Sequence, residues 1–519
     1  MQPILQLVAA LLFDGAISWV RMLIALFLSI FVGIGFGIAA NRSSSAERVL
    51  LPLFDILQTL PILAFFPLAI YIVMATLPPV IGINAAVILL IFTSMVWNIG
   101  FGAYEAIRTM PREFAEVAET FRLGPMERLS KVLVPAAMPK VVEQSMLSWS
   151  IGLFYLVTSE IFSTGSQQYS VRYGIGAALV HLAFSGDIAS YVIGIAVFIA
   201  FVVVTRLTLF SYLEDRFVKR DLGVRRPKKG PSMMVGAAVE RRFEIAGRIF
   251  ERRTAAAIGR LTRIREARRV QRRIRDGSLI MLFALISVVI LILLTNSGIR
   301  ADEAGVLYAM ALSLGRISAA LAVIAAISIP LGIYIVFITK NGGSYTKLFQ
   351  ILASIPATLL LPALVIALRG APSEGELVAL LIFFLSGFWY MLFGIISTRA
   401  TLDRSIGEVR EAFGVRGGRA WRFVYLGAIM PGLITGTITA IAAEWNASIV
   451  AEYFTTSGVG AGTAVVSVGN GLGKLLDLAL SSGNLQLMAL GLINLTIIII
   501  VLNRVVWKRA YNRVMSVYR

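Results

Sequence analysis

The side chains that usually perform catalysis or bind metals are nearly absent from this sequence. It has no cysteine and one histidine, His181. Without thiols there is no disulfide framework, thiolate metal site or cysteine nucleophile, and one histidine makes neither a metal cluster nor a Ser-His-Asp arrangement. We therefore predict that the chain is not an enzyme and has no catalytic residue and no metal site, and we interpret His181 as a surface residue.

A glycine-rich stretch before a lysine comes closest to a phosphate-binding loop. Such a loop needs Gly-x-x-x-x-Gly-Lys-Ser/Thr, so that backbone amides and the lysine hold the phosphates. Residues 469–475 have the wrong glycine spacing, and Leu475 follows Lys474 where a hydroxyl is required. The sequence therefore predicts no nucleotide site and no cofactor bound by this chain.

Three glutamates lie in otherwise apolar stretches, where an ionisable group is costly and suggests a function. Glu160 and Glu452 are expected near the outer ends of their helices, where they either line the mouth of a pathway or tie the following loop in place. Glu444 lies deeper, in a polar group that is aligned with Gly152 and its apolar neighbours elsewhere in the chain. This group either lines a route through the membrane or packs between two halves of the protein, and it contains Glu444, Trp445, Asn446 and Ser448.

Membrane-spanning helices must position these groups. Of the 519 residues, 58% are hydrophobic and 15% charged, whereas soluble proteins carry roughly 25% charged residues. A spanning helix needs about 20 mostly apolar residues. We predict an all-α integral membrane fold with about 11 spans and allow for ten or twelve. The spans are placed near 18–40, 49–74, 80–103, 140–162, 188–212, 278–295, 310–338, 348–368, 376–398, 432–454 and 486–506.

Prolines recur inside two of the predicted spans. Pro61, Pro67, Pro356 and Pro362 are expected to bend these helices and to contribute to a gate. No Lys or Arg is expected inside a span, so an anionic cargo would depend on hydroxyls, amides and helix ends.

The chain contains an internal duplication, because many residues recur at a nearly constant separation. The separation is 295 positions for Arg21 and Arg316, and 292 for Glu160 and Glu452. Small changes of separation between long constant stretches are typical of duplication followed by changes in loop length. Further matches are Pro61 with Pro356, Pro67 with Pro362, Glu116 with Glu408, Glu119 with Glu411, Phe121 with Phe413 and Pro139 with Pro431.

The distribution of basic residues predicts the orientation of the two copies. Residues 216–275 contain 20 Lys or Arg and five acidic residues, which we interpret as a cytoplasmic linker that obeys the positive-inside rule and contacts anionic lipid headgroups. No aromatic-basic pattern supports nucleic-acid binding. Equivalent loops then fall on the same side, so the copies are parallel, with the amino terminus outside and the carboxyl terminus inside. The predicted domains are 1–215, the linker 216–275 and 276–519, the last with one extra amino-terminal span.

Two amphipathic segments, 104–139 and 399–431, are predicted on the cytoplasmic side. One contains Glu116-Val117-Ala118-Glu119-Thr120-Phe121, and the other Glu408-Val409-Arg410-Glu411-Ala412-Phe413. They resemble the Glu-Ala-Ala loop of ABC-importer permeases, and the two copies together resemble the duplicated permeases of nitrate, sulfonate and taurine importers. The motif's glycine is kept at Gly414 but is Arg122 in the first copy, where Gly124 follows two residues later.

This resemblance implies a type I permease fold and a mechanical role for both segments. In the family, each loop forms a coupling helix that sits in a groove of an ATPase subunit, and a glycine permits the sharp turn. The residues assigned to coupling are Glu116, Ala118, Glu119, Arg122, Gly124, Glu408, Arg410, Glu411 and Gly414.

The resemblance also implies partners and a location. The implied partners are two copies of an ATPase, which bind ATP and Mg²⁺, an extracytoplasmic substrate-binding protein, and the lipids of the plasma (inner) membrane. The implied function is ATP-driven import of a small anion by alternating access. Two other functions remain open: a secondary transporter with parallel repeats, and a membrane scaffold or sensor that acts through the basic linker.

Overall fold

The computed structural model describes residues 2–59, 73, 76–110, 114, 118–165, 171–218, 299–339, 341–353, 355–398, 417–458 and 462–502. Most of the basic linker and the extra span predicted at 278–295 lie outside these residues. The same holds for Pro61, Pro67, Glu116, Glu408, Arg410, Glu411 and Gly414.

The first copy is built from long apolar helices joined by short ones. Three further segments, η1 (Leu129–Leu133), η2 (Arg206–Phe210) and η3 (Glu214–Val218), are π-helical. The α-helices are α1 (Gln2–Arg42), α2 (Ser44–Thr59), α4 (Pro79–Arg108), α6 (Pro125–Arg128), α7 (Val134–Gly165), α8 (Ile175–Phe184), α9 (Ile188–Thr205) and α10 (Ser211–Leu213).

The second copy repeats this order of elements. Its π-helical segments are η5 (Tyr334–Ile338) and η7 (Ala420–Tyr425). Its α-helices are α12 (Ile299–Ile333), α13 (Gly342–Ala353), α14 (Ala357–Ala367), α15 (Glu374–Ser397), α17 (Gly417–Arg419), α18 (Leu426–Glu452), α19 (Leu472–Ser481) and α20 (Leu485–Leu502). The predicted helical membrane fold in two repeats is therefore confirmed.

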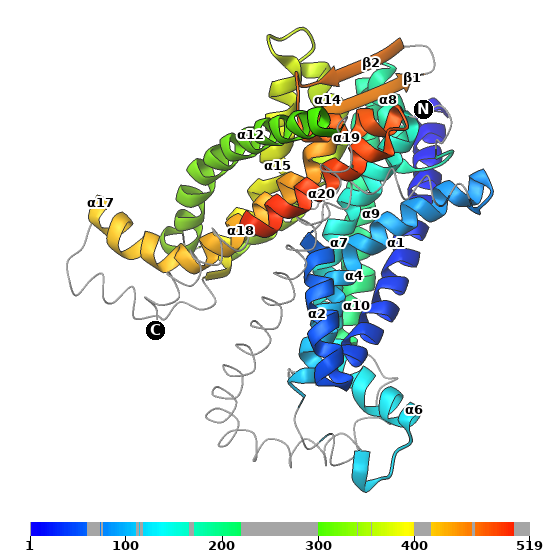
Figure 1. The fold of residues 1–519 in the computed structure, drawn as a ribbon, viewed down its shortest axis with the longest axis vertical. Coiled ribbons are helices and arrows are strands. Elements are labelled where there is room, and N and C mark those ends of the chain that lie inside the picture. The colour runs from blue at the N-terminus through cyan, green and yellow to red at the C-terminus, as the bar shows by residue number, and fades with distance from the viewer. Residues whose placement is uncertain are drawn as a thin grey trace.

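Among the described residues, one β-hairpin interrupts the helical structure. Strands β1 (Tyr453–Gly458) and β2 (Gly462–Ser467) pair antiparallel directly after α18, and they lie at the same end of the molecule as α8 and α19 (Figure 1). Between Glu452 and Gly471 the separation of the repeats grows from 292 to 297 positions. The five additional residues of the second copy therefore lie in the connection that contains the hairpin.

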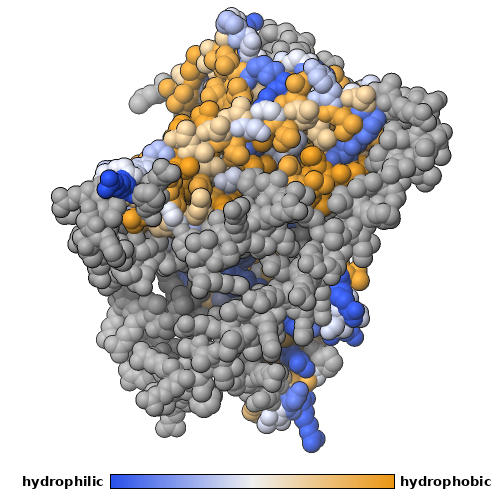
Figure 2. Space-filling model, turned by 60° about the vertical axis from the view of Figure 1, so that its left-hand side comes forward, coloured by the Kyte–Doolittle hydropathy of each residue, from blue (hydrophilic) through white to orange (hydrophobic). Residues whose placement is uncertain are grey.

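Both copies expose the same helix face. On α1, Leu12, Phe13, Leu28 and Val32 are exposed, and the residues 295 positions later on α12 are exposed as well. These are Leu307, Tyr308, Val323 and Ile327. Figure 2 shows apolar side chains gathered over much of the upper part of one face. Six described helices are long and apolar enough to cross a membrane, which is the hydrophobic exterior expected of a multi-pass membrane protein.

The largest hydrophobic core contains buried residues of both copies, such as Leu153 and Val450, and helices of each copy contact the other. Helix α4 packs between α1 and α7, and α15 packs between α12 and α18. Helix α14 of the second copy contacts α7 and α8 of the first, whereas α2 of the first contacts α20 of the second. The hydroxyl of Tyr191 on α9 donates a 2.6 Å hydrogen bond to the carbonyl oxygen of Leu359 on α14.

Prolines mark where the structure departs from the predicted boundaries. The span predicted at 348–368 is not one bent helix, because α13 ends at Ala353 and a new helix, α14, begins directly after Pro356. Proline disfavours helical conformation in the preceding residue, which explains the break. Pro139 and Pro431, the last residues of the two segments predicted to be cytoplasmic, lie inside α7 and α18.

Candidate functional site

A buried ion pair joins three distant parts of the first copy. Glu160 near the end of α7 accepts hydrogen bonds from Arg21 Nη1 at 2.5 Å and Ser18 Oγ at 2.7 Å, both on α1. Its other oxygen accepts the backbone N–H of Gly176 at 2.8 Å, and Ser18 Oγ accepts that of Ile175 at 3.0 Å. Because carboxylates are favoured at helix N-termini, this first polar cluster fixes the start of α8 against α1 and α7.

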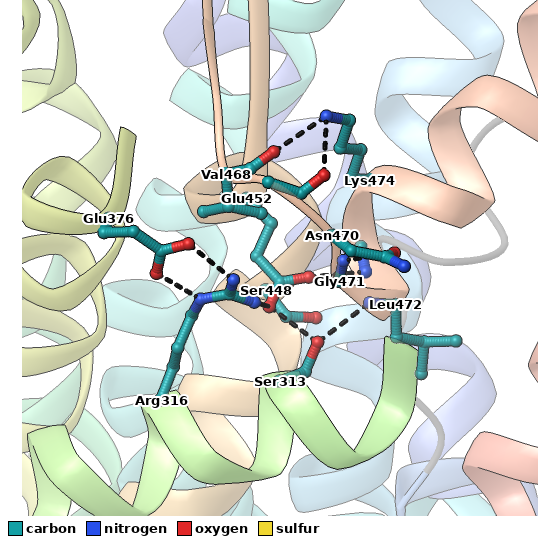
Figure 3. A network of polar contacts seen from close by, with 12 residues as sticks. Ser313, Arg316, Glu376, Ser448, Glu452, Val468, Asn470, Gly471, Leu472 and Lys474 are labelled. Carbon is teal, nitrogen blue, oxygen red and sulfur yellow. Dashed lines mark hydrogen bonds and ion pairs between the residues drawn. The ribbon is translucent and has the colours of Figure 1, made fainter. Parts of the chain in front are cut away.

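The second copy contains the same arrangement (Figure 3). Glu452 at the end of α18 accepts from Ser313 Oγ at 2.6 Å and from Arg316 Nη1 at 3.1 Å, both on α12. It also accepts the backbone N–H of Gly473 at 2.7 Å, and Ser313 Oγ accepts that of Leu472 at 2.8 Å. This second polar cluster fixes the start of α19 in the same way.

The two clusters correspond residue by residue, although their members recur at three different sequence separations. Ser18 and Arg21 recur after 295 positions, Glu160 after 292, and the residues at the start of α8 after 297. Both glutamate side chains are fully buried. Of the two roles expected for Glu160 and Glu452, the contacts correspond to tying the following loop in place.

The clusters differ in one charge. In the first, Arg21 Nε donates to the amide oxygen of Asn84 at 2.9 Å. At the equivalent position of the second stands Glu376, whose two oxygens accept from Arg316 Nε and Nη2 at 2.6 Å each. The second polar cluster therefore holds two carboxylates around one guanidinium in the bidentate geometry typical of strong Arg–carboxylate pairs.

Glycines leave room for these carboxylates. A Cβ atom built on Gly174 would lie 2.6 Å from Glu160 Cδ, and one built on Gly471 would also collide with the carboxylate of Glu452. The two glycines are 297 positions apart. Sequence reasoning did not assign Ser18, Ser313 or these glycines to a site, although their shared separations were a usable signal.

The expectation that no Lys or Arg lies inside a span was wrong. Arg21 lies midway along α1 and Arg316 midway along α12, where both are held by the buried glutamates. They are neutralised and hydrogen-bonded, as a buried charge requires. Lys474, from the rejected phosphate loop, donates instead to the carbonyl oxygens of Val468 at 2.7 Å and Gly469 at 3.2 Å.

The asymmetric polar group of α18 is mostly enclosed. Glu444, Trp445 and Ser448 are at most 2% exposed, and Ser448 Oγ donates to the carbonyl oxygen of Trp445. Asn446 is half-buried and donates to the carbonyl oxygen of Ala442 at 2.9 Å. In this conformation, Asn446 is the member of the group that reaches the surface.

Part of the first segment predicted to be cytoplasmic is described, and it lies at the end of the molecule opposite the hairpin (Figure 1). Ala118 is buried and Glu119 is exposed. The turn occurs at Arg122, whose φ of 47° is left-handed, whereas Gly124 has no positive φ. Arg122 thus occupies the position at which the family motif has glycine, the residue that adopts this conformation without strain.

This segment also exposes apolar side chains. Phe121 is 70% exposed and Met126 is 74% exposed. Glu127, in the first turn after Gly124, pairs with Lys131 at 2.7 Å. The hydrogen bond from Lys131 lowers the pKa of Glu127, which favours its charged form. This surface therefore presents the apolar side chains of Phe121 and Met126 beside a charged pair.

A family model described as "Binding-protein-dependent transport system inner membrane component" matches residues 7–220 and, separately, residues 342–509. The two matches cover more than half of the chain, and each lies within one of the two structural copies, the second beginning at the start of α13. No solved structure matches the chain.

Curated relatives match over shorter stretches. The bicarbonate transport system permease protein CmpB of Synechocystis sp. is 26% identical over 27% of this chain and 47% of the relative. The nitrate import permease protein NrtB of Leptolyngbya laminosa is 25% identical over 29% of this chain and 51% of the relative. The glycine betaine/proline betaine transport system permease protein ProW of Escherichia coli is 26% identical over 38% of this chain and 51% of the relative. The chain spans about half the length of these curated relatives.

Proposed function

Since the chain belongs to the family of binding-protein-dependent transport system inner membrane components, we propose that it is the permease subunit of an ATP-driven ABC importer. Two permease copies are fused in one polypeptide and together enclose one pathway. The observation that carries this proposal is the duplication, because the family match, the order of the helices and the buried polar cluster all occur twice.

Each copy supplies one coupling segment to one ATPase subunit, and ATP and Mg²⁺ bind on that partner. In the first copy, the proposed surface contains Phe121 and Met126, whose exposed apolar area is the kind that marks a protein interface. The left-handed turn at Arg122 sets the direction of the segment. Coupling is assigned to Glu116, Ala118, Glu119, Arg122 and Gly124, and in the second copy to Glu408, Arg410, Glu411 and Gly414.

The proposed cargo is a small anion such as bicarbonate or nitrate, delivered by an extracytoplasmic binding protein. Support comes from the similarity to the bicarbonate permease CmpB and the nitrate permease NrtB. Because Arg21 and Arg316 are already paired, neither offers a free charge in this conformation. Recognition therefore rests mainly on the binding protein, and hydroxyls, amides and helix ends line the route.

Transport proceeds by alternating access between two global states. The break between α13 and α14 at Pro356 and the half-buried Asn446 are the described candidates for the gate. The polar clusters hold α8 and α19 rigidly at the end with the hairpin, which we place on the outer side of the inner membrane. The coupling segments, the basic linker and the carboxyl terminus lie in the cytoplasm, and the linker contacts anionic lipids.

The stoichiometry of the complex tests this proposal. The purified chain, mixed with the ATPase encoded beside it, is expected to form a complex of one permease chain and two ATPase subunits, measured by native mass spectrometry. A single permease repeat would offer one coupling segment and bind one subunit. A chain that binds no ATPase subunit at all would contradict the assignment.

A further inference from the structure

Glu444, in the second half of α18, carries a buried carboxyl group that the proposed pathway does not use. Its side chain is fully buried, and neither carboxyl oxygen has a hydrogen-bond partner among the residues that the structure describes. A Cβ atom built on Gly387 of α15 would lie 3.2 Å from Glu444 Oε1 and 2.8 Å from Ile324 Cδ1 of α12. The carboxyl group therefore lies against a bare stretch of α15 and an isoleucine.

The equivalent place in the first copy has the reverse arrangement of large and small residues. Met95 on α4 stands where α15 has Gly387, and Gly152 on α7 stands where α18 has Glu444. The thioether end of Met95 occupies the space that a side chain on Gly152 would need. Glu444 thus fills, from the opposite helix, a core position that an apolar side chain fills in the first copy.

The described charged side chains on the elements packed around α18 form no hydrogen bond with Glu444. Arg316 on α12 and Glu376 on α15 bind each other in the second polar cluster, and Lys474 on α19 donates to loop carbonyls. Among the side chains that the structure describes, the other titratable groups on these elements are Asp302, Glu303 and Tyr308 of α12, Glu374 and Tyr390 of α15, Tyr425 of η7, Tyr453 of β1 and Asp477 of α19. None of them forms a hydrogen bond to either oxygen of Glu444.

An isolated carboxylate in such surroundings is far less stable than the neutral acid. Burying a charge without a partner or hydrogen bonds costs so much that the group takes up a proton instead. Glu160 and Glu452 differ from Glu444 in this respect. Each of those buried carboxylates accepts hydrogen bonds from an arginine, a serine and a backbone N–H. Glu444 has none of these donors.

We propose that Glu444 is a proton-binding site, occupied as long as α15 and α18 remain packed together at Gly387. A conformation that separates the two helices there would admit water and allow the acid to ionise. Protonation therefore stabilises the packed arrangement of the second copy, and by linkage the packed arrangement holds the proton. The first copy, with Met95 in this place, lacks such a site.

Infrared spectroscopy of the full chain tests this site without any ATPase, so its result is independent of the transport assignment. The probe is the proton, exchanged for deuterium in D₂O at neutral pH, where an exposed glutamate is ionised. The C=O stretch of a carboxylic acid absorbs at higher frequency than amides and carboxylates. We expect Glu444→Gln to lose one acid C=O band relative to the wild type.

The matched control is Glu127→Gln, which removes an exposed carboxylate paired with Lys131 and is expected to lose carboxylate bands only. If Glu444→Gln also lost carboxylate bands and no acid band, the proposal would be overturned. A second variant guards against a failure to fold. Glu444→Gly combined with Gly387→Met reproduces the first copy's pair of residues, and it is expected to fold and to lose the same acid band.

Discussion

Replacing Glu160 with leucine is expected to destabilise the chain by about 3–5 kcal/mol, the usual cost of removing one partner of a buried ion pair. The substitution leaves the Arg21 guanidinium buried without its carboxylate and removes the acceptor for the N–H of Gly176. Thermal unfolding of the detergent-solubilised chain measures the effect. Gly174→Ala is expected to act in the same direction, because the new methyl group would collide with Glu160.

Two comparisons separate this effect from general damage. The double variant Arg21→Leu with Glu160→Leu is expected to recover part of the loss, because no uncompensated charge remains. Glu127→Leu, which breaks an exposed pair, is expected to change the melting temperature little. A Glu160→Leu variant as stable as Glu127→Leu would show that the first polar cluster does not hold the fold together.

The second polar cluster should be more tolerant of the same change. Glu452→Leu leaves Arg316 in its two hydrogen bonds with Glu376, whereas Glu160→Leu leaves Arg21 with only neutral acceptors, the oxygens of Asn84 and Tyr173. We therefore expect Glu452→Leu to lower the melting temperature less than Glu160→Leu.

Introducing aspartate at Phe121 and Phe413 together is expected to abolish co-purification of the ATPase. Phe121 is 70% exposed in the described part of the proposed coupling segment, and Phe413 is its sequence equivalent 292 positions later. Aromatic residues at the centre of an interface commonly contribute about 2 kcal/mol or more, so each substitution should weaken its own contact about thirtyfold or more. Pull-down of the tagged chain and stimulation of ATP hydrolysis measure the effect.

The conservative pair Phe121→Leu with Phe413→Leu is the control, because it keeps an apolar side chain and should retain most of the binding. Each single aspartate variant is expected to leave one ATPase bound. Unchanged ATPase binding and stimulation in the double aspartate variant would show that these segments are not the docking surface. Glu116→Arg with Glu408→Arg is expected to have the same effect as the double aspartate variant.

The duplication made the overall architecture predictable. Matches at nearly constant separations predicted two helical copies, which the family match and the helix order confirm. Glu160 and Glu452 were identified because an ionisable group in an apolar stretch is conspicuous. Their partners Ser18 and Gly174 were not, because serine and glycine are common in membrane helices and loops. Their role becomes evident once the fold brings three segments together.

Other features depend on tertiary context that a pattern does not show. Arg21 lies near the start of the span predicted at 18–40, but α1 begins at Gln2 and places it in the interior of the helix. The hairpin had a signal in its aromatic and β-branched residues, which the strong helical pattern around it obscured. The exchange of Met95 and Gly152 for Gly387 and Glu444 could not be recognised without knowing which faces of the helices touch.

The most direct test of the central claim is uptake of radiolabelled bicarbonate or nitrate by proteoliposomes that contain the full chain, its ATPase and its binding protein. We expect uptake to require ATP on the side of the membrane that carries the coupling segments. Uptake should stop when the ATPase is omitted. Uptake that continues without the ATPase and follows an ion gradient would contradict the account and identify the chain as a secondary transporter.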